Sequence, residues 1–133
     1  MATSKKLTDR ASISRPKRLR TPAGITDVHV DLPDGSEVVE AKRGHSRRFV
    51  REALAQLLDY APHTPEPAVR LSALFPARPA DHDLALLHRY GVDCVYRTHP
   101  MTFERAPAPQ QTRASMMLLW QQARPSATAA DND

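Results

Sequence analysis

The chain contains few cysteine, glycine or aromatic residues. Its 133 residues include one cysteine, four glycines and 5% Phe, Trp and Tyr. The single cysteine, Cys94, excludes an intrachain disulfide, which is typical of proteins in a reducing cytoplasm. The scarcity of aromatic residues means that a hydrophobic core must consist mainly of Leu, Val and Ala. The length suits one domain rather than two.

Long apolar segments are also missing. No stretch approaches the roughly 20 apolar residues that a membrane-spanning helix needs. The basic N-terminus has no apolar segment of the kind found in a signal peptide. We therefore expect a cytoplasmic protein that does not interact with a membrane.

Positive charge is concentrated at the N-terminus. The formal net charge is +4, and residues 1–21 hold seven basic residues and one acidic residue, so the remainder carries about −2. A basic arm on a nearly neutral body is typical of proteins that bind polyanions such as DNA, although a solubilising tail would have the same composition. We expect residues 1–21 to be a flexible arm, at most a frayed helix or strand near its end, with Lys17, Arg18 and Arg20 as nucleic-acid contacts.

Two segments near the arm predict a β-hairpin. Residues 25–32 alternate polar and apolar side chains, and residues 37–42 form a second short run. Asp-Gly is a strong hairpin signal. If Asp34 and Gly35 are the two turn residues, Asp27 lies opposite Lys42 and diagonal to Glu40, and all three point to one face of the sheet.

Helical and extended segments then alternate. Apolar residues recur with helical spacing over residues 45–60, where Ser46 is a reasonable N-cap. A buried strand is expected over 69–75, a short helix ending at Arg89 before Gly91, and a last strand over 92–97. A hairpin followed by helical crossovers indicates an α/β fold with a mixed sheet flanked by helices.

The C-terminal part is expected to be less regular. Prolines in residues 100–110 predict an irregular segment, and residues 111–123 predict one further helix that covers the sheet or faces a partner. We expect residues 22–100 to form the core, residues 101–124 the Pro-rich segment and helix, and residues 125–133 a disordered tail.

Two carboxylates and one lysine suggest a chemical site. Asp27 and Glu40, on neighbouring strands, would converge on one divalent cation, and hard oxygen ligands suit Mg²⁺ or Mn²⁺ better than zinc. Lys42 beside them would hold a water molecule or stabilise charge on a phosphate. The same three residues would also be compatible with ordinary surface ion pairs, which contribute little.

These residues resemble a known motif. Asp27 followed by Glu40-Ala41-Lys42 resembles the core of the PD-(D/E)xK nuclease superfamily, and Gln56-x-x-x-Tyr60 is similar to the motif of its RecB-like branch. The resemblance implies a restriction-endonuclease-like fold and a Mg²⁺-dependent nuclease. It implies that Asp27, Glu40 and the Ala41 carbonyl hold the metal, that Lys42 is catalytic, that Gln56 supports the site, and that Tyr60 positions DNA or braces the helix.

The resemblance has departures and open points. Thr26 replaces the proline of the family motif, and no acidic helix precedes the hairpin. A basic turn at the mouth of the site would bind phosphate or would simply be solvated, and its candidate residues are Arg43, His45, Arg47 and Arg48. His29 and Cys94 are interpreted as an ordinary strand residue and a core residue.

Two classes of function follow. The first is a metal-dependent DNA nuclease used in restriction, defence, repair or recombination. The second is a non-catalytic, nuclease-fold protein that binds nucleic acid or docks on a larger enzyme. A homodimer or a larger nuclease or helicase partner is compatible with either function. A third interpretation is an RNA-cleaving toxin, but the sequence contains no residues distinctive of one.

Overall fold

The computed structural model describes the backbone of residues 17–21 and 24–29 and all atoms of residues 30–125. The predicted flexibility of residues 1–16 and the predicted disorder of residues 126–133 concern positions outside this range. The elements, in chain order, are β1 (Lys17–Thr21), β2 (Gly24–Leu32), β3 (Gly35–Ala41), α1 (Arg47–Tyr60), the short 3-10 helix η2 (Ala61–His63), β4 (Ala68–Phe75), α2 (Asp81–Arg89), β5 (Val92–His99), β6 (Thr102–Ala106) and α3 (Gln110–Gln122).

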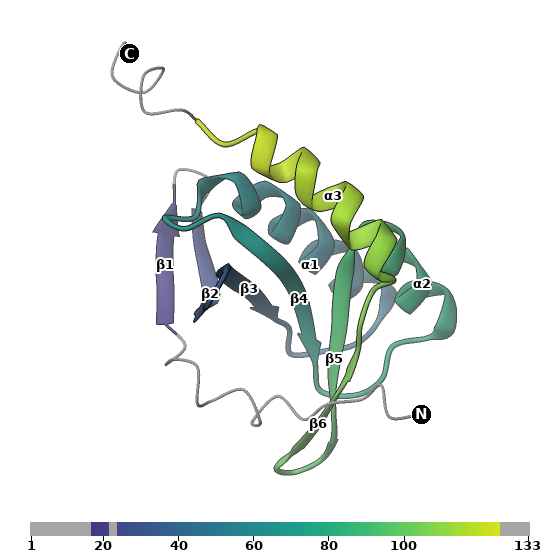
Figure 1. Ribbon diagram of the computed structural model, residues 1–133. Coiled ribbons are helices and arrows are strands. Elements are labelled where there is room, and N and C mark those ends of the chain that lie inside the picture. The colour runs from purple at the N-terminus through teal and green to yellow at the C-terminus, as the bar shows by residue number, and fades with distance from the viewer. Residues whose placement is uncertain (1–16, 22–23, 126–133) are drawn as a thin grey trace.

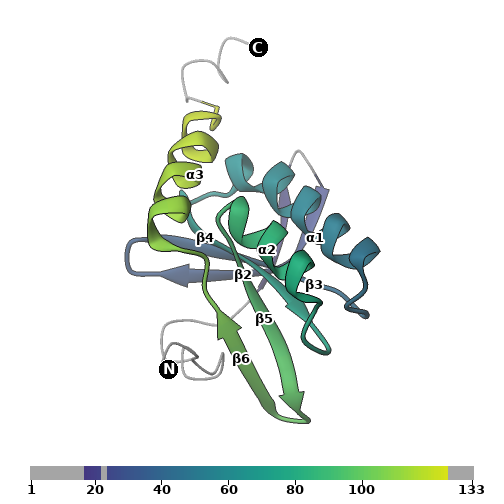
Figure 2. The same ribbon diagram turned by 90° about the vertical axis from the view of Figure 1, so that its right-hand side faces the viewer.

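The described strands form one mixed sheet, in the order β1-β2-β3-β4-β5-β6. The pairs β1–β2, β2–β3 and β5–β6 are antiparallel, whereas β3, β4 and β5 run parallel to one another. Figures 1 and 2 show a curled sheet with α1, α2 and α3 gathered on one side of it. The predicted α/β class with a mixed sheet is therefore confirmed. None of the helices in the described range is long and apolar enough to cross a membrane.

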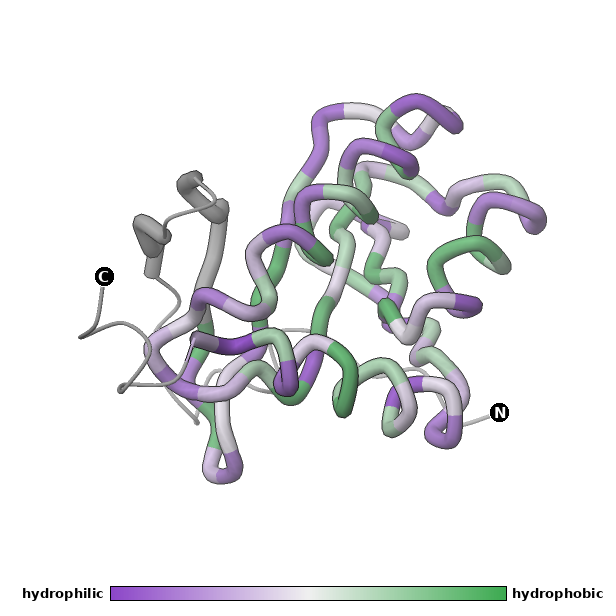
Figure 3. Tube along the Cα trace, turned by 90° about the horizontal axis from the view of Figure 1, so that it is seen from above, coloured by the Kyte–Doolittle hydropathy of each residue, from purple (hydrophilic) through white to green (hydrophobic). Residues whose placement is uncertain are grey.

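Most element boundaries follow the predicted patterns. Helix α1 begins directly after Ser46 and ends before Pro62, and α2 ends before Gly91. Gly91 has a φ of 76°, which favours glycine, and a Cβ there would lie 3.0 Å from Cβ of Met116. Hydrophilic and hydrophobic residues alternate along the coiled segments of Figure 3, and the buried residues of α1 recur every three to four positions, as expected for an amphipathic helix.

Two strands go beyond the sequence expectation, which allowed at most a frayed helix or strand at the end of the arm and predicted an irregular segment over residues 100–110. Residues 17–21 form β1 and pair with β2, so the end of the predicted arm is part of the sheet. Residues 102–106 form β6 inside the segment predicted to be irregular. Its one buried side chain is that of Arg105, so no apolar alternation marks it as a strand. Its ion-pair partner Glu37 lies 68 residues away in the sequence, beyond any local pattern.

The predicted hairpin register is wrong by one residue on each strand. Leu32 pairs with Gly35, so Pro33 and Asp34 form the turn. Proline, with φ near about −65°, is favoured at the first central position of common turns. Gly35 serves close packing instead, because a Cβ on it would lie 2.5 Å from the carbonyl oxygen of Pro67. The shift preserves which residues share a face of the sheet.

The hydrophobic core lies between the sheet and the three helices. Val38, Leu71 and Val92 occupy matched positions on β3, β4 and β5. They belong to one buried cluster with α1 residues such as Val50 and Leu57. The cluster is built largely from Leu, Val and Ala, as the composition predicted, and Trp120 of α3 completes it. Figure 1 shows α3 crossing above the strands near the starts of β4 and β5.

Helix α3 is attached to the sheet by specific hydrogen bonds. The Trp120 indole and the Gln121 amide both donate to the Ala68 carbonyl oxygen, at 2.7 and 2.9 Å. Leu118 and Leu119 are exposed on the other side of the helix. The predicted C-terminal helix therefore covers the end of the sheet through Trp120.

The other face of the central strands holds a buried charged network. Arg105 donates to Glu37 at 2.9 Å and to Asp93 at 3.0 Å, and all three residues are buried. Ser72 lies between them and donates to Glu37 at 2.6 Å. This network joins β3, β4, β5 and β6 by charge-assisted hydrogen bonds.

Replacement of Arg105 by leucine should strongly destabilise the protein. The change leaves two buried carboxylates without their main cation, which costs about 3–5 kcal/mol. Urea unfolding followed by circular dichroism would measure this loss. The control is Arg97→Leu, because Arg97 is exposed on β5 and its loss should cost less than about 0.5 kcal/mol. Equal unfolding midpoints for the two variants would contradict a structural role for the network.

Cys94 should be chemically inert in the folded protein. Its side chain is fully buried in the core, as predicted, and this burial raises the pKa of the thiol from 9.0 to about 12. The reactive thiolate is therefore scarce at pH 8, and reagents cannot reach it. An aromatic disulfide reagent should modify Cys94 rapidly in urea and very slowly without it. Equal rates in both conditions would show that the thiol is accessible.

Candidate functional site

Lys42 is the centre of the candidate site. It follows β3 directly, and its backbone N–H donates to the Leu74 carbonyl oxygen at 2.9 Å. Its ammonium donates to Oε1 of Gln56 at 2.6 Å and lies 3.5 Å from Oε2 of Glu40. The Lys42 side chain is 12% exposed. The end of β3 and the middle of α1 therefore meet at this ammonium.

Helix α1 presents one row of side chains toward this point. Arg48, Glu52, Gln56 and Tyr60 are spaced four residues apart, so they lie on neighbouring turns of one helix face. Gln56 reaches Lys42, whereas Tyr60 is buried at the end of α1. Of the two roles implied for Tyr60, its burial favours bracing the helix rather than contacting DNA.

Glu40 is held in the interior beside the lysine. It is paired with Ala73 of the core on β4, and its side chain is 7% exposed. A buried carboxylate is stabilised by a nearby cation, here the Lys42 ammonium. Ala41, between them, is the last residue of β3. Glu40, Lys42 and Gln56 are thus brought together as the motif predicted.

Asp27 is described only by its backbone position in β2. The ladder between β2 and β3 ends at the pair of Val28 and Val39, one residue short of Asp27. Continuing this register by one step places Asp27 opposite Glu40, rather than opposite Lys42 as the predicted turn required. The side chains of Asp27 and His29 lie outside the described range.

The donor atoms around Lys42 suit a hard cation. Carboxylate oxygens of Glu40 and Glu52 lie 3.5 and 3.6 Å from the ammonium. Among the described side chains, no three His, Cys, Asp or Glu residues come together as a metal-binding group. A metal at this position would therefore need Asp27 in addition to Glu40, with the Ala41 carbonyl as a further oxygen donor.

The predicted basic turn is folded around one aromatic ring. The guanidinium carbons of Arg43 and Arg48 lie 5.4 and 5.3 Å from the Phe49 ring centroid. Gly44 permits this arrangement, since a Cβ on it would lie 2.5 Å from Phe49. Cation–π contacts of this kind hold the arginines in place while both side chains remain exposed.

The remaining nucleic-acid candidates divide into two groups. His45 is exposed, and Arg47 is exposed with its guanidinium 3.6 Å from Asp83. The side chains of Lys17, Arg18 and Arg20 lie outside the described range, although their backbone belongs to β1. The structure therefore places a basic turn next to Lys42 and leaves the arm's contribution as a prediction.

Glu52 is the residue of this cluster that the sequence interpretation missed. Its Oε1 lies 3.6 Å from the Lys42 ammonium, and its Oε2 accepts from Arg48 at 3.3 Å. Its position four residues before Gln56 was the available signal. Glu52 connects the basic turn to the lysine at the site.

Comparisons with known proteins identify no relative. The chain matches no protein-family model, and no curated protein or solved structure is significantly similar to it. The functional argument therefore depends on the residues of this chain and their geometry.

The contact between Lys42 and Gln56 should be energetically stronger than the contact between Lys42 and Glu52. The first is a short hydrogen bond to a charged donor in a mostly buried position, and we expect a coupling energy of about 1.5 kcal/mol. The second involves a side chain that is 45% exposed, so about 0.5 kcal/mol or less is expected.

Double-mutant cycles would measure both couplings from unfolding free energies. One cycle combines Lys42→Met with Gln56→Leu, and the other combines Lys42→Met with Glu52→Gln. A larger coupling energy for the Lys42–Glu52 pair than for the Lys42–Gln56 pair would show that the exposed Glu52 is the residue that orients the ammonium.

Proposed function

We propose that this protein is a metal-dependent nuclease that hydrolyses phosphodiester bonds in DNA, with a core related to the PD-(D/E)xK superfamily. The observation that carries the proposal is the 2.6 Å hydrogen bond from Lys42 to Gln56. It joins the two separate sequence motifs, Glu40-Ala41-Lys42 and Gln56-x-x-x-Tyr60. Sequence similarity to a motif does not require such contact, so the geometry is independent support.

In this proposal Gln56 and Glu40 orient the ammonium of Lys42, and the ammonium stabilises charge on the phosphate. Gln56 and the buried Glu40 hold the Lys42 ammonium at the end of β3. An ammonium fixed in advance stabilises negative charge that develops on a phosphate during hydrolysis. Orientation by two partners reduces the reorganisation needed when a substrate arrives.

A Mg²⁺ ion would be held by Asp27, Glu40 and the carbonyl of Ala41, and Mn²⁺ would be a possible substitute. When bound, such an ion polarises a phosphate oxygen and lowers the pKa of a coordinated water. Glu40 lies next to Lys42, so metal and ammonium would act on the same phosphate.

The surrounding charge favours a nucleic-acid backbone, and DNA is the proposed substrate. The side chains of Arg47 and Arg48 are 59% and 71% exposed, and Arg48 is linked to Lys42 through Glu52. Guanidinium groups in this position bind backbone phosphates and set the position of the strand without reading its sequence. Arg43 and His45 extend the same turn.

The exposed basic turn also supports a second function. A non-catalytic nucleic-acid-binding or adaptor protein would use the same arginines and would not need Lys42 or Glu40. In that case binding would weaken steeply with salt and would be insensitive to replacement of the two site residues.

Mg²⁺-dependent cleavage of DNA by the full chain should depend on Glu40 and Lys42. We expect Glu40→Gln and Lys42→Met to lower the cleavage rate by about 100-fold or more, because each removes charge from the reacting centre. The matched controls are Asp59→Asn and Arg51→Gln, exposed residues of α1, which should cleave at the wild-type rate. Circular dichroism would verify that each variant is folded.

A defined set of results would contradict nuclease activity. A folded wild-type chain that binds DNA and does not cut it with Mg²⁺ or Mn²⁺ would contradict the nuclease proposal. If DNA binding in that chain also falls for Arg47→Gln and Arg48→Gln but not for Glu40→Gln, the adaptor function would be supported.

A further inference from the structure

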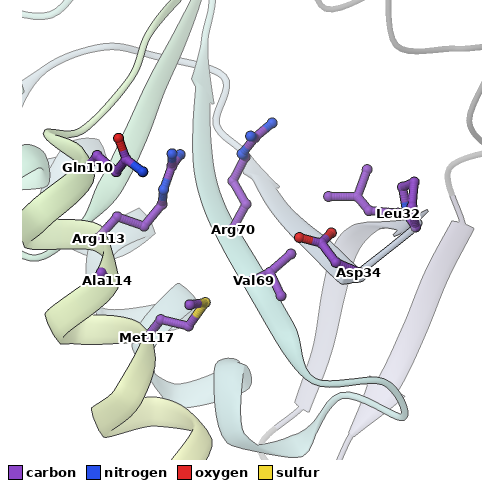
Figure 4. A pocket seen from close by; sticks show the side chains of 9 residues that line it. Leu32, Asp34, Val69, Arg70, Gln110, Arg113, Ala114 and Met117 are labelled. Carbon is purple, nitrogen blue, oxygen red and sulfur yellow. The ribbon is translucent and has the colours of Figure 1, made fainter.

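A second candidate binding site lies at the other end of β3. The structure contains a cavity of about 320 Å³ between the β2–β3 turn, the start of β4 and the first turns of α3. Figure 4 shows the side chains that line it. Apolar atoms come from Val69, Ala114 and Met117, and the cationic groups come from Arg70 and Arg113.

One buried carboxylate organises the two arginines. Nε of Arg70 lies 3.8 Å from Oδ2 of Asp93, and Nη1 of Arg113 lies 3.6 Å from the same oxygen. Asp93 is fully buried and is itself held by Arg105 at 3.0 Å and by the N–H of Ala108 at 2.8 Å. In Figure 4 the two side chains extend in the same direction, one from β4 and one from α3.

The unused donors of this cluster favour an anion. Three guanidinium groups face the two carboxylates of Glu37 and Asp93, and Asp34 in the lining adds a third carboxylate, so anion binding depends on the N–H groups that Arg113 leaves unused and not on net charge. Arg113 is 22% exposed, and within the described range its guanidinium donates no hydrogen bond at ordinary length. A guanidinium carries five N–H donors. Most donors of Arg113 are therefore available to an incoming oxyanion.

We propose that this cavity binds a small organic anion with one carboxylate or phosphate group on an apolar body. The oxyanion would accept hydrogen bonds from Arg113 and Arg70, a geometry that guanidinium groups favour. The apolar body would lie on Val69 and Met117. Asp34 and Gln110 line the same cavity and provide polar contacts for a hydroxyl or amino group.

The cavity is separate from the proposed nuclease site. Its lining residues adjoin the first residue of β3, whereas Lys42 follows the last, and seven residues of a strand span about 20 Å. Arg70 pairs in register with Glu37, whose side chain belongs to the charged face, whereas Glu40 pairs with Ala73 of the core. The inference therefore does not depend on nuclease activity.

Isothermal titration at constant ionic strength would test the proposal with three probes. Thymidine 5′-monophosphate carries a phosphate on an organic body, benzoate carries a carboxylate on an apolar ring, and inorganic phosphate has no such body. We expect at least one of the two organic probes to bind, and its identity would distinguish the two anion types. Inorganic phosphate should bind more weakly than the organic probe.

Two variants separate charge from shape. Arg113→Gln removes the available guanidinium and should weaken binding about tenfold or more, the effect of losing a hydrogen bond to a charged group. Ala114→Leu retains both arginines and fills the cavity, so it should have a similar effect. The control is Arg97→Gln, which makes the same charge change on an exposed part of β5 and should bind like the wild type.

Several outcomes would overturn the proposal. Failure of the wild-type chain to bind either organic probe would do so, as would equal weakening by Arg97→Gln, which would indicate non-specific charge attraction. Binding unaffected by Ala114→Leu would place the probe outside the cavity. A parallel loss of DNA affinity in Arg113→Gln would assign this surface to nucleic acid instead of a small molecule.

Discussion

The packing of α1 against β3 and β4 is the interaction on which the candidate site depends. Val50 and Leu57 of the helix share a buried cluster with Val38 and Leu71 of the sheet. Burial of such apolar area is the main favourable contribution to folding, so the position of the helix is strongly determined. Because Gln56 occurs on the same helix, this packing brings its amide to Lys42. Without it, the lysine would be an ordinary residue at the end of a strand.

The two faces of the sheet are stabilised by different physical effects. One face packs against helices through apolar side chains, and the other joins four strands through Arg105 and its carboxylate partners. A buried ion pair gains little over a well-packed apolar pair, but removal of one partner is costly. The charged network therefore favours one arrangement of β6 and α3. It also aligns Arg70 and Arg113 at a cavity distant from Lys42.

The candidate site was predictable where it depended on local spacing. Alternation in β3 places Glu40 and Lys42 on one face, and the four-residue spacing in α1 aligns Gln56 with Tyr60. The hairpin register was predicted wrongly because Pro33, not Gly35, occupies the turn. The error left the shared face intact, since side chains alternate with a period of two. Glu52 was missed although it occurs four residues before Gln56, because this spacing alone is also typical of an exposed surface residue of a helix.

By itself the sequence determined the α/β class and the strands and helices with clear apolar periodicity, and its resemblance to a known motif predicted which residues of β3 and α1 would meet. Periodicity has this power because it records which side of each element is buried. Tertiary structure alone decided the strand β6, the pairing of Arg105 with Glu37, and the convergence of Arg70 and Arg113 on Asp93. These contacts join residues far apart in the chain, so their energy depends on the folded arrangement and leaves no local pattern in the sequence.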